Sequence, residues 1–349
     1  MDPCVLAIGF GEPAEPDPAA VRAYLEGIFL DNMAIEGDVP EDAAAARASE
    51  LADARAPGLL EEYEAIGGSP LGDHLEAHAR RLEAELRGRG HDVPVHVATQ
   101  YFRPSIESAV EAVHSAGRDH VVGLPMYPLC GPSTTVRALS SLAAAIDTVD
   151  GWDPALTPIA GWHRHPRYNR LRAANVRAVA EARDLDLGGD VELVFSAHGT
   201  PLSYLEAGSR YDTYVEEYCE VQARLLGLEA YTLGFQNHES RGVEWTEPDV
   251  ETALASVEAD GVLVEPVSFI HEQSETISEL DVELAEHAED LGLAFDRVPV
   301  PHDDPELAGV LADLVEPAVA GFDDTYYGLR ACRCADTPGT RCLCGPVAR

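Results

Sequence analysis

The sequence predicts an α/β fold made of two similar doubly wound (Rossmann-like) halves with parallel sheets, followed by an irregular cysteine-rich tail. Short β-branched runs alternate with longer helical stretches through nearly the whole 349-residue chain, a pattern typical of parallel sheets with helices on both faces. The strand runs are continuously apolar, as they are in strands buried on both faces. Because the alternation runs twice, we predict domains at 1–150 and 151–325 and a tail at 326–349.

The same patterns place the individual elements. We expect strands at residues 5–10, 93–99, 120–126, 156–162, 191–197, 231–236, 261–267 and 295–300. We expect helices at residues 18–30, 71–89, 105–116, 134–148, 167–184, 203–227, 249–259, 276–291 and 305–320. Residues 36–60 are acidic, alanine-rich and weakly patterned, so we expect a mobile excursion there.

The composition is strongly acidic. The chain has 62 Asp and Glu residues against 24 basic ones, and its formal net charge is −38. Such a chain repels polyphosphate, which argues against nucleic-acid binding. An acidic shell suits a cytoplasm rich in salt, where screening shortens the range of self-repulsion, so we predict a halophilic enzyme.

No stretch reaches the ~18 consecutive apolar residues that a membrane span needs. The N-terminal residues also lack the basic and apolar regions of a secretory signal. We therefore expect a cytoplasmic protein without a membrane span, present as a monomer or a homodimer.

The first candidate site residue is His198, at the end of the apolar strand in residues 195–201 (FSAHGTP). In doubly wound sheets ligands bind beyond the carboxyl ends of the strands. A neutral imidazole there can ligate a divalent metal or accept a proton near pH 7. The alternative is that His198 only caps the loop or bonds a backbone carbonyl.

A row of acidic residues follows another strand end. Glu275, Glu279, Glu283 and His287 are spaced four apart, so they lie along one helix face. Like charges at this spacing destabilise a helix, and a divalent metal bound by their oxygens would relieve that cost. The alternative, in so acidic a protein, is a solvated helix face.

Tyr127, Ser133 and Thr134 lie in a third segment that follows an apolar strand, where the hydroxyls can cap the next helix. The sequence contains neither GxGxxG nor GxxxxGK[ST], so nothing in it indicates a nucleotide site.

Seven cysteines occur, and four of them form a CxC-x7-CxC pattern in the tail: Cys332, Cys334, Cys342 and Cys344. An odd number in a cytosolic chain argues against a disulfide framework. Four thiolates in a tail can close around Zn(II) or a [2Fe–2S] cluster. A disordered, reduced tail is the alternative.

Taken together, the segments resemble ferrochelatase, the enzyme that inserts ferrous iron into a porphyrin. The most specific match is the Ser-Ala-His-Gly-x-Pro signature at 196–201. Other blocks match in order along almost the whole chain: residues 9–13 (GFGEP), 62–71 (EYEAIGGSPL), 103–107 (RPSIE), 124–128 (LPMYP), 202–208, the stretch with Gln236, Trp245 and Pro248, and 269–281.

The resemblance implies a chelatase-like fold in which His198 and Glu275 are the central catalytic pair and contact the metal. It implies that they face each other across an interdomain cleft, with room for the macrocycle between them. Glu279 and Glu283 then continue an acidic track for metal or protons. We predict that the porphyrin contacts Phe10, Tyr127, Ser133 and Thr134.

Some ferrochelatases hold a [2Fe–2S] cluster with three C-terminal cysteines and one from the loop after the Tyr-Pro strand. Cys130 lies in that loop. The resemblance therefore implies five candidate ligands for four places: Cys130, Cys332, Cys334, Cys342 and Cys344.

Two departures from the family pattern stand near the site. Gln273 occupies the place of a histidine two residues before the catalytic glutamate, so either His271 substitutes for it or a supporting role is absent. The usual Met-Arg-Tyr strand end is Thr-Gln-Tyr at 99–101, which loses an arginine for a porphyrin propionate. Arg103 and Arg137 are candidate replacements.

The predicted function is therefore insertion of Fe(II), as substrate, into coproporphyrin III or protoporphyrin IX in haem biosynthesis. Phe10 and the cysteine tail resemble the soluble bacterial branch of the family, and the acidic 36–60 segment lacks the apolar lip of membrane-associated relatives; this resemblance favours coproporphyrin. The alternatives are a cobalt or nickel chelatase for another tetrapyrrole and a non-catalytic porphyrin or haem carrier.

Overall fold

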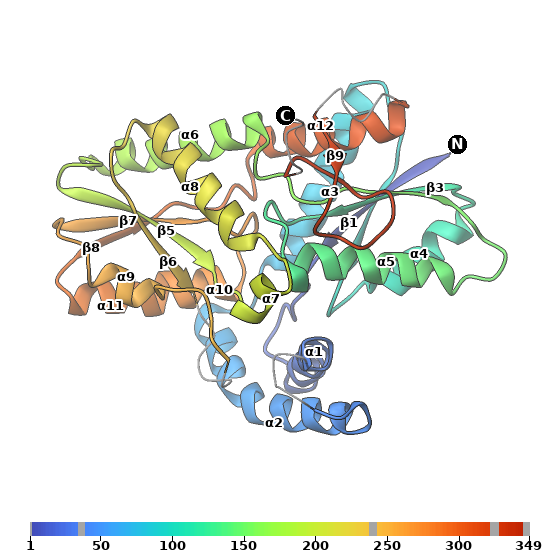
Figure 1. Ribbon diagram of the computed structural model, residues 1–349, viewed down its shortest axis with the longest axis horizontal. Coiled ribbons are helices and arrows are strands. Elements are labelled where there is room, and N and C mark those ends of the chain that lie inside the picture. Colours follow the sequence, from blue (N-terminus) through green and yellow to red (C-terminus); the bar gives the residue numbers. More distant parts are fainter. Residues whose placement is uncertain (1, 34–38, 237–242, 322–327, 345–349) are drawn as a thin grey trace.

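The computed structural model describes residues 2–33, 39–236, 243–321 and 328–344. It contains two parallel four-stranded sheets that lie side by side (Figure 1). The first has the order β2-β1-β3-β4, with β2 at Val95–Thr99, β1 at Pro3–Gly9, β3 at His120–Pro125 and β4 at Ala155–Pro158. The second has the equivalent order β6-β5-β7-β8, at Thr232–Gln236, Val191–His198, Gly261–Pro266 and Ala294–Arg297. The fold class and all eight predicted strands are confirmed.

Helices connect successive strands, as parallel pairing requires. Those close to their predicted positions are α1 (Pro18–Asp31), α3 (Leu71–Gly88), α4 (Ile106–Ser115), α5 (Arg137–Asp147), α6 (Pro166–Arg183), α9 (Val250–Leu254) and α12 (Pro305–Ala320). A π-helical turn, η2 (Pro132–Val136), precedes α5.

The predicted mobile excursion at 36–60 is wrong for the part of it that the structure describes. Residues 39 and 40 lead into α2 (Glu41–Ile66), a 26-residue helix, while 36–38 lie outside the described residues. The buried face of α2 includes Ala48, Ala52 and Ala56 at helical spacing. Alanine has the highest helix propensity but little apolar surface, so the helix escapes a search for large apolar side chains. It packs against α1 below the junction of the two sheets (Figure 1).

Two other predicted helices are interrupted. The one at 203–227 divides into α7 (Leu202–Glu206) and α8 (Tyr211–Leu226), with Gly208 between them at a φ of +105°, which favours glycine. The one at 276–291 divides into α10 (Ser274–Ile277), the π-helical turn η3 (Glu279–Leu284) and α11 (Ala285–Asp290).

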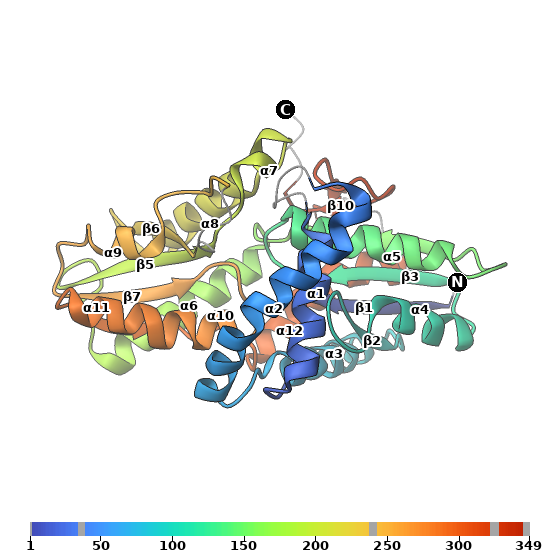
Figure 2. The ribbon, with the colours of Figure 1, turned by 90° about the horizontal axis from the view of Figure 1, so that it is seen from below.

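The two halves are tied together by elements that cross between them. Strand β4 comes after residue 150 but belongs to the first sheet. Helix α12, near the end of the second half, packs on α3 of the first half as well as on α6 (Figure 2). In the tail, the short strands β9 (Arg330–Ala331) and β10 (Arg341–Cys342) pair antiparallel, and Arg341 bridges to Ile159 beside β4. The predicted domain boundaries stay a prediction.

Among the described residues, no helix is both long enough and apolar enough to cross a membrane.

Candidate active site

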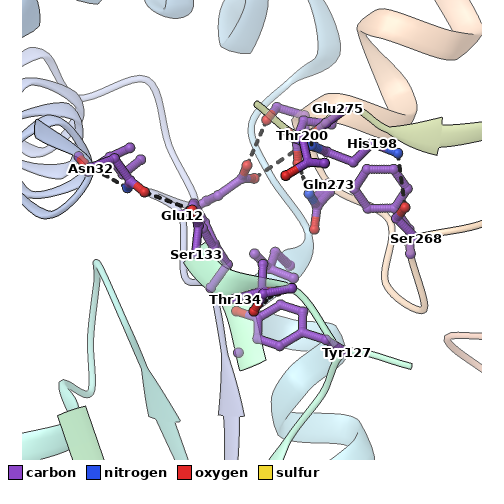
Figure 3. Close-up of a pocket in the computed structure, with 18 of the residues that line it drawn as sticks. Glu12, Asn32, Tyr127, Ser133, Thr134, His198, Thr200, Ser268, Gln273 and Glu275 are labelled. Carbon is purple, nitrogen blue, oxygen red and sulfur yellow. Dashed lines mark hydrogen bonds and ion pairs between the residues drawn. The ribbon is translucent and has the colours of Figure 1, made fainter. Parts of the chain in front are cut away.

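A cavity of about 260 Å³ lies where the carboxyl ends of the two sheets meet (Figure 3). Its lining comes from both halves of the chain. The first half contributes the four residues predicted to contact substrate, Phe10, Tyr127, Ser133 and Thr134, and the second contributes His198, Glu275 and Glu279.

His198 and Glu275 form an ion pair on the wall of this cavity. His198 ends β5, and its Nε2 lies 3.1 Å from Oε1 of Glu275 in α10. The backbone N–H of His198 donates to Ser268 Oγ at 2.9 Å, and Nδ1 bonds the Gly199 carbonyl at 2.6 Å. With Nδ1–H given to that carbonyl, Nε2 needs a second proton to donate to the carboxylate, so the geometry favours an imidazolium.

We expected His198 and Glu275 to face each other across the cleft with the macrocycle between them. This expectation is wrong, because the two side chains are in direct contact. Both residues belong to the second half, since α10 follows β7, the neighbour of β5 in the sheet. The carboxyl ends of adjacent parallel strands meet at one edge, which brings the two side chains into contact. A flat macrocycle therefore has room only on the cavity side of the pair, against the first half.

The pKa of His198 is raised to about 9. Burial is the largest influence and lowers it, but the Glu275 carboxylate, the hydrogen bond to it, the Gly199 carbonyl and Glu279 together outweigh burial. Near pH 7 the His198–Glu275 pair therefore holds one titratable proton, the extra proton of the imidazolium.

Glu279 and Glu283 extend from the pair towards the surface along η3. The Glu279 carboxylate accepts a hydrogen bond from Gln236 Nε2 at 2.9 Å, and burial followed by the charge of Glu275 raises its pKa to about 8. Glu283 is exposed and accepts a bond from Ser278 at 3.4 Å. The row thus begins at the half-buried His198–Glu275 pair and ends at Glu283 in solvent. Between them lies Glu279, whose carboxyl is mostly protonated at pH 7.

Gln273 and His271 have separate surroundings. The Gln273 amide donates directly to Glu275 Oε2, so a neutral donor supports the glutamate at this position. His271 instead packs its ring against His78, with ring centroids 4.8 Å apart. His271 therefore does not take over the contact with Glu275.

Sequence reasoning missed Glu12. It lies in the Gly-x-Pro turn after β1, lines the cavity and is 4% exposed. It accepts hydrogen bonds from Ser274 Oγ at 2.6 Å and from the Ser274 backbone at 3.3 Å, which ties the first half to the residue before Glu275. Burial raises the pKa of Glu12 to about 7. The sequence did offer a signal for Glu12. It is a carboxylate between Gly11 and Pro13, in a turn that was matched only by its resemblance to the family.

The first-half wall is held by a hydrogen-bond chain. Tyr127 donates to Gln100 Oε1 at 2.6 Å, and Gln100 donates to the Ser133 carbonyl at 3.1 Å. The Ser133 hydroxyl donates to Asn32 at 2.8 Å, and the Phe10 and Tyr101 rings lie edge to face with centroids 4.7 Å apart. This wall is preorganised before substrate arrives.

Neither arginine proposed for a propionate lines the cavity. Arg137 is paired with Asp31, and Arg103 is exposed on the loop after β2. Arg55 of α2 does line it, and its Nη2 lies 2.6 Å from Glu62 Oε1.

All five candidate cluster cysteines come together. The Sγ atoms of Cys130, Cys332 and Cys334 lie within 4.8 Å of one another. The free thiol of Cys332 also has Cys342 as a hydrogen-bonding neighbour, and Cys342 has Cys344. Hydrogen bonds from Cys130, then Cys334, lower the pKa of Cys332 to about 7, which favours the thiolate that ligates metals. Cys4 and Cys219 are buried elsewhere in the core.

Comparisons with known proteins agree on one family. The family model described as Ferrochelatase matches residues 3–319. A ferrochelatase of a Synechococcus species is 35% identical over 325 residues, covering 90% of this chain and 92% of the relative. One of Citrifermentans bemidjiense is 32% identical over 319 residues, covering 90% and 98%.

Two solved structures share the fold. CbiX, described as the terminal enzyme of sirohaem biosynthesis in denitrifying bacteria, has a TM-score of 0.52 at 17% identity, covering 90% of this chain and 99% of its own. SirB from Bacillus subtilis has a TM-score of 0.52 at 10% identity, covering 92% and 97%.

Proposed function

Because the chain belongs to the ferrochelatase family, it is an enzyme that inserts iron into a porphyrin in haem biosynthesis, and we propose that it does so at the cavity holding His198 and Glu275. The observation that carries this assignment of the site is the His198–Glu275 contact of 3.1 Å, on a cavity wall opposite Tyr127 and Phe10.

The reaction must remove two pyrrole N–H protons and deliver Fe(II) to the ring face. In the resting pair the imidazolium already carries a proton, so the Glu275 carboxylate is the group that accepts one from the porphyrin. Glu279 first releases its own proton through Glu283 to solvent and then takes the pyrrole proton from Glu275, which leaves Glu275 free to accept the second pyrrole proton. Carboxylate oxygens, and the His198 imidazole once it has lost its extra proton, are hard to borderline ligands for Fe(II), which suits a site that binds the metal only in passing.

The macrocycle would lie between this pair and the first-half wall. Phe10 and Tyr127 offer apolar faces, while Ser133 and Thr134 offer hydroxyls near the rim. Arg55 is the cation placed to meet a propionate, which it would do by exchanging Glu62 for the substrate carboxylate. We favour coproporphyrin, because Arg55 at the cavity can meet one of its four propionates.

The other two candidate functions make different predictions. A cobalt or nickel chelatase would metallate another tetrapyrrole in preference to a porphyrin. A carrier would bind porphyrin but leave its free-base absorption bands unchanged when Fe(II) is added. The direct hydrogen bond from Gln273 to Glu275 supports catalysis, because the glutamate keeps an orienting partner.

The cysteine group fits a [2Fe–2S] cluster, since three sulfurs lie within 4.8 Å of one another and a fourth thiol bonds one of them. We propose Cys130, Cys332, Cys334 and Cys342 as its ligands, because Cys344 is engaged by His163 Nδ1 at 3.1 Å. When bound, such a cluster supplies one-electron chemistry and crosslinks the tail to the loop after β3. After anaerobic reconstitution, Cys342→Ser should lose the cluster absorption and Cys344→Ser should keep it.

The acidic composition supports the proposal that this is a halophilic enzyme, which is therefore tested in high KCl. We also propose, from the sequence, a cytoplasmic location and a monomer or a homodimer.

The test of the proposed site is anaerobic metallation of coproporphyrin III with Fe(II), followed by loss of the free-base bands. We expect His198→Ala and Glu275→Gln to lower the rate by ~10²–10⁴-fold, the size of a general acid–base contribution. His114→Ala, on the exposed face of α4, is the matched control and should retain the wild-type rate. Wild-type rates in both site variants would overturn the assignment.

A further inference from the structure

Four histidines from three segments of the chain gather beside the cavity. His74 and His78 lie on α3, His271 follows β7, and His302 precedes α12. The rings of His74 and His302 stack with centroids 4.0 Å apart and an interplanar angle of 17°. Those of His78 and His271 lie 4.8 Å apart at 59°. We call these four residues the histidine cluster.

Three ring nitrogens of the histidine cluster are buried without a protein hydrogen-bond partner in the described part of the chain: Nδ1 of His74 and Nε2 of both His78 and His271. His78 is 3% exposed and His271 is 5% exposed. Burying a polar atom without a partner is costly, so two such imidazoles side by side call for a function.

The ionisation state of these side chains suits metal binding. Burial, then the charges of Arg81 and His74, lower the pKa of His78 to about 3. Burial followed by the other cluster members lowers that of His271. Both rings are therefore neutral near pH 7, which is the form that ligates metals.

Acidic side chains surround the outer pair. Glu272, Asp73 and Asp303 act on His74 in the direction that favours positive charge there. Two cations lie near: Arg81, whose Nη1 donates to the His302 carbonyl at 2.9 Å, and Arg297, whose Nη1 lies 3.2 Å from Glu272 Oε1. The carboxylates thus offset only part of the effect of burial and His302, which lower the pKa of His74 and keep its ring neutral.

The position of the cluster links it to the proposed reaction. His271 also lines the cavity, and it lies four residues before Glu275. The cluster therefore borders the same cavity as the His198–Glu275 pair.

We propose that the histidine cluster binds a divalent first-row transition metal ion, with His78 and His271 as its first two ligands. Imidazole nitrogen suits Fe(II), Co(II), Ni(II) and Zn(II). No three of the cluster's ring nitrogens lie within 4.8 Å of one another in the described chain, so binding turns the stacked rings of His74 or His302 to supply a third ligand. Resting on the proposed function, the cluster holds the metal substrate beside the cavity before insertion.

The first test needs no porphyrin. Full-length protein, stripped of metal and kept anaerobic in high KCl, is dialysed against Co(II), and the bound ion is counted. His78→Leu/His271→Leu should lose one equivalent relative to wild type. His198→Ala and the surface control His114→Leu should keep that equivalent. Leucine fills the buried space without a polar atom, so the double variant should fold as well as wild type by circular dichroism.

Absorption spectra identify the ligands of the lost ion. Cobalt on the cysteine group gives intense thiolate charge-transfer bands, whereas cobalt on imidazoles gives only weak ligand-field bands. The double variant should lose the weak bands and keep the intense ones. An unchanged cobalt count in a folded double variant, or loss of thiolate bands alone, would overturn the proposal.

The second test addresses the link to catalysis. In the metallation assay the double variant should raise the KM for Fe(II) at least severalfold while kcat at saturating Fe(II) changes little. A wild-type enzyme that binds the cluster ion but never metallates porphyrin would end the proposed function and leave the metal site standing. Wild-type KM for Fe(II) in the double variant would end the link to catalysis.

Discussion

Two carboxylate ion pairs of the second half, Arg172–Glu265 and His198–Glu275, differ in the partner of the carboxylate and in their exposure. Glu265, in β7, pairs with Arg172 of α6 at 2.7 Å, and both side chains are 0% exposed. Tyr218 donates a further hydrogen bond to Glu265 at 2.8 Å. Glu275 lies at the start of α10, the helix that follows β7, and pairs with His198 at 3.1 Å. The Glu275 side chain is 22% exposed and the His198 side chain 30%.

The difference lies in the partner and in access. A guanidinium never gives up its proton in a protein, so the Arg172–Glu265 pair is fixed in charge and serves structure. An imidazole can release its proton, and an open wall lets substrate reach it. The same carboxylate therefore becomes structural or reactive according to what faces it and what can enter.

The largest expected effect sharpens this contrast in stability. Glu265→Gln leaves the Arg172 guanidinium buried without a counter-charge, and we expect the free energy of unfolding to fall by ~3–5 kcal/mol. Glu275→Gln should lower it by less, because its partner His198 reaches the cavity and can lose its extra proton. Chemical denaturation in high KCl measures both.

A double substitution checks the cause. Arg172→Met/Glu265→Leu removes both charges and should recover most of the lost stability, since apolar replacements of a buried pair are often neutral. If the double variant were as unstable as Glu265→Gln, packing and not charge would explain the loss.

Removing one supporting hydrogen bond from each pair should have a smaller effect than removing a charge. In the His198–Glu275 pair it should lower the metallation rate, and in the Arg172–Glu265 pair it should lower stability. Gln273→Ala takes away the donor to Glu275, and we expect roughly a tenfold loss of metallation rate, about the worth of a hydrogen bond to a charged group. Tyr218→Phe takes away the donor to Glu265 and should lower stability by ~1.5–3 kcal/mol with an unchanged rate. Equal rate losses in the two variants would break the comparison.

The sequence predicted the two residues of the proposed catalytic pair but not their arrangement. His198 and Glu275 were identifiable from strand ends and the family resemblance, because both follow apolar runs that parallel strands require. Their direct contact was not, because it depends on β5 and β7 being neighbours in the sheet. Pattern along one chain does not specify strand order.

Two other features were out of reach for different reasons. Helix α2 buries alanines, whose small side chains leave little hydrophobic period to detect. Glu12 contacts Ser274 across 262 positions of sequence, so its role depends on tertiary structure alone. The cysteine group, by contrast, was predictable because four of its members are adjacent in the tail.

The pH dependence of stability should also separate the two pairs. The pKa of His198 rises from 6.5 to about 9 on folding, so its stabilisation is complete below 6.5 and is lost as pH rises to 9. Glu279, raised from 4.5 to about 8, disfavours folding as it ionises over that interval. Stability should therefore fall between pH 6 and 9, and His198→Ala/Glu279→Gln should flatten the curve. Arg172 keeps its charge throughout this range and contributes no slope.

Salt should have the smallest differential effect. The net charge of −38 predicts that stability rises with KCl as self-repulsion is screened. The stability difference between wild type and Tyr218→Phe should stay constant, because bulk ions do not reach the buried pair. No gain in stability up to molar KCl would end the halophilic interpretation.

The central claim is that the His198–Glu275 pair holds one titratable proton at the cavity wall. Nuclear magnetic resonance of the His198 ring, followed against pH in wild type and in Glu275→Gln, tests it directly. The account predicts a pKa raised to about 9 in wild type and one below the ordinary 6.5 in the variant, where burial acts without the carboxylate. A His198 that titrates at the same pH in both proteins would contradict it.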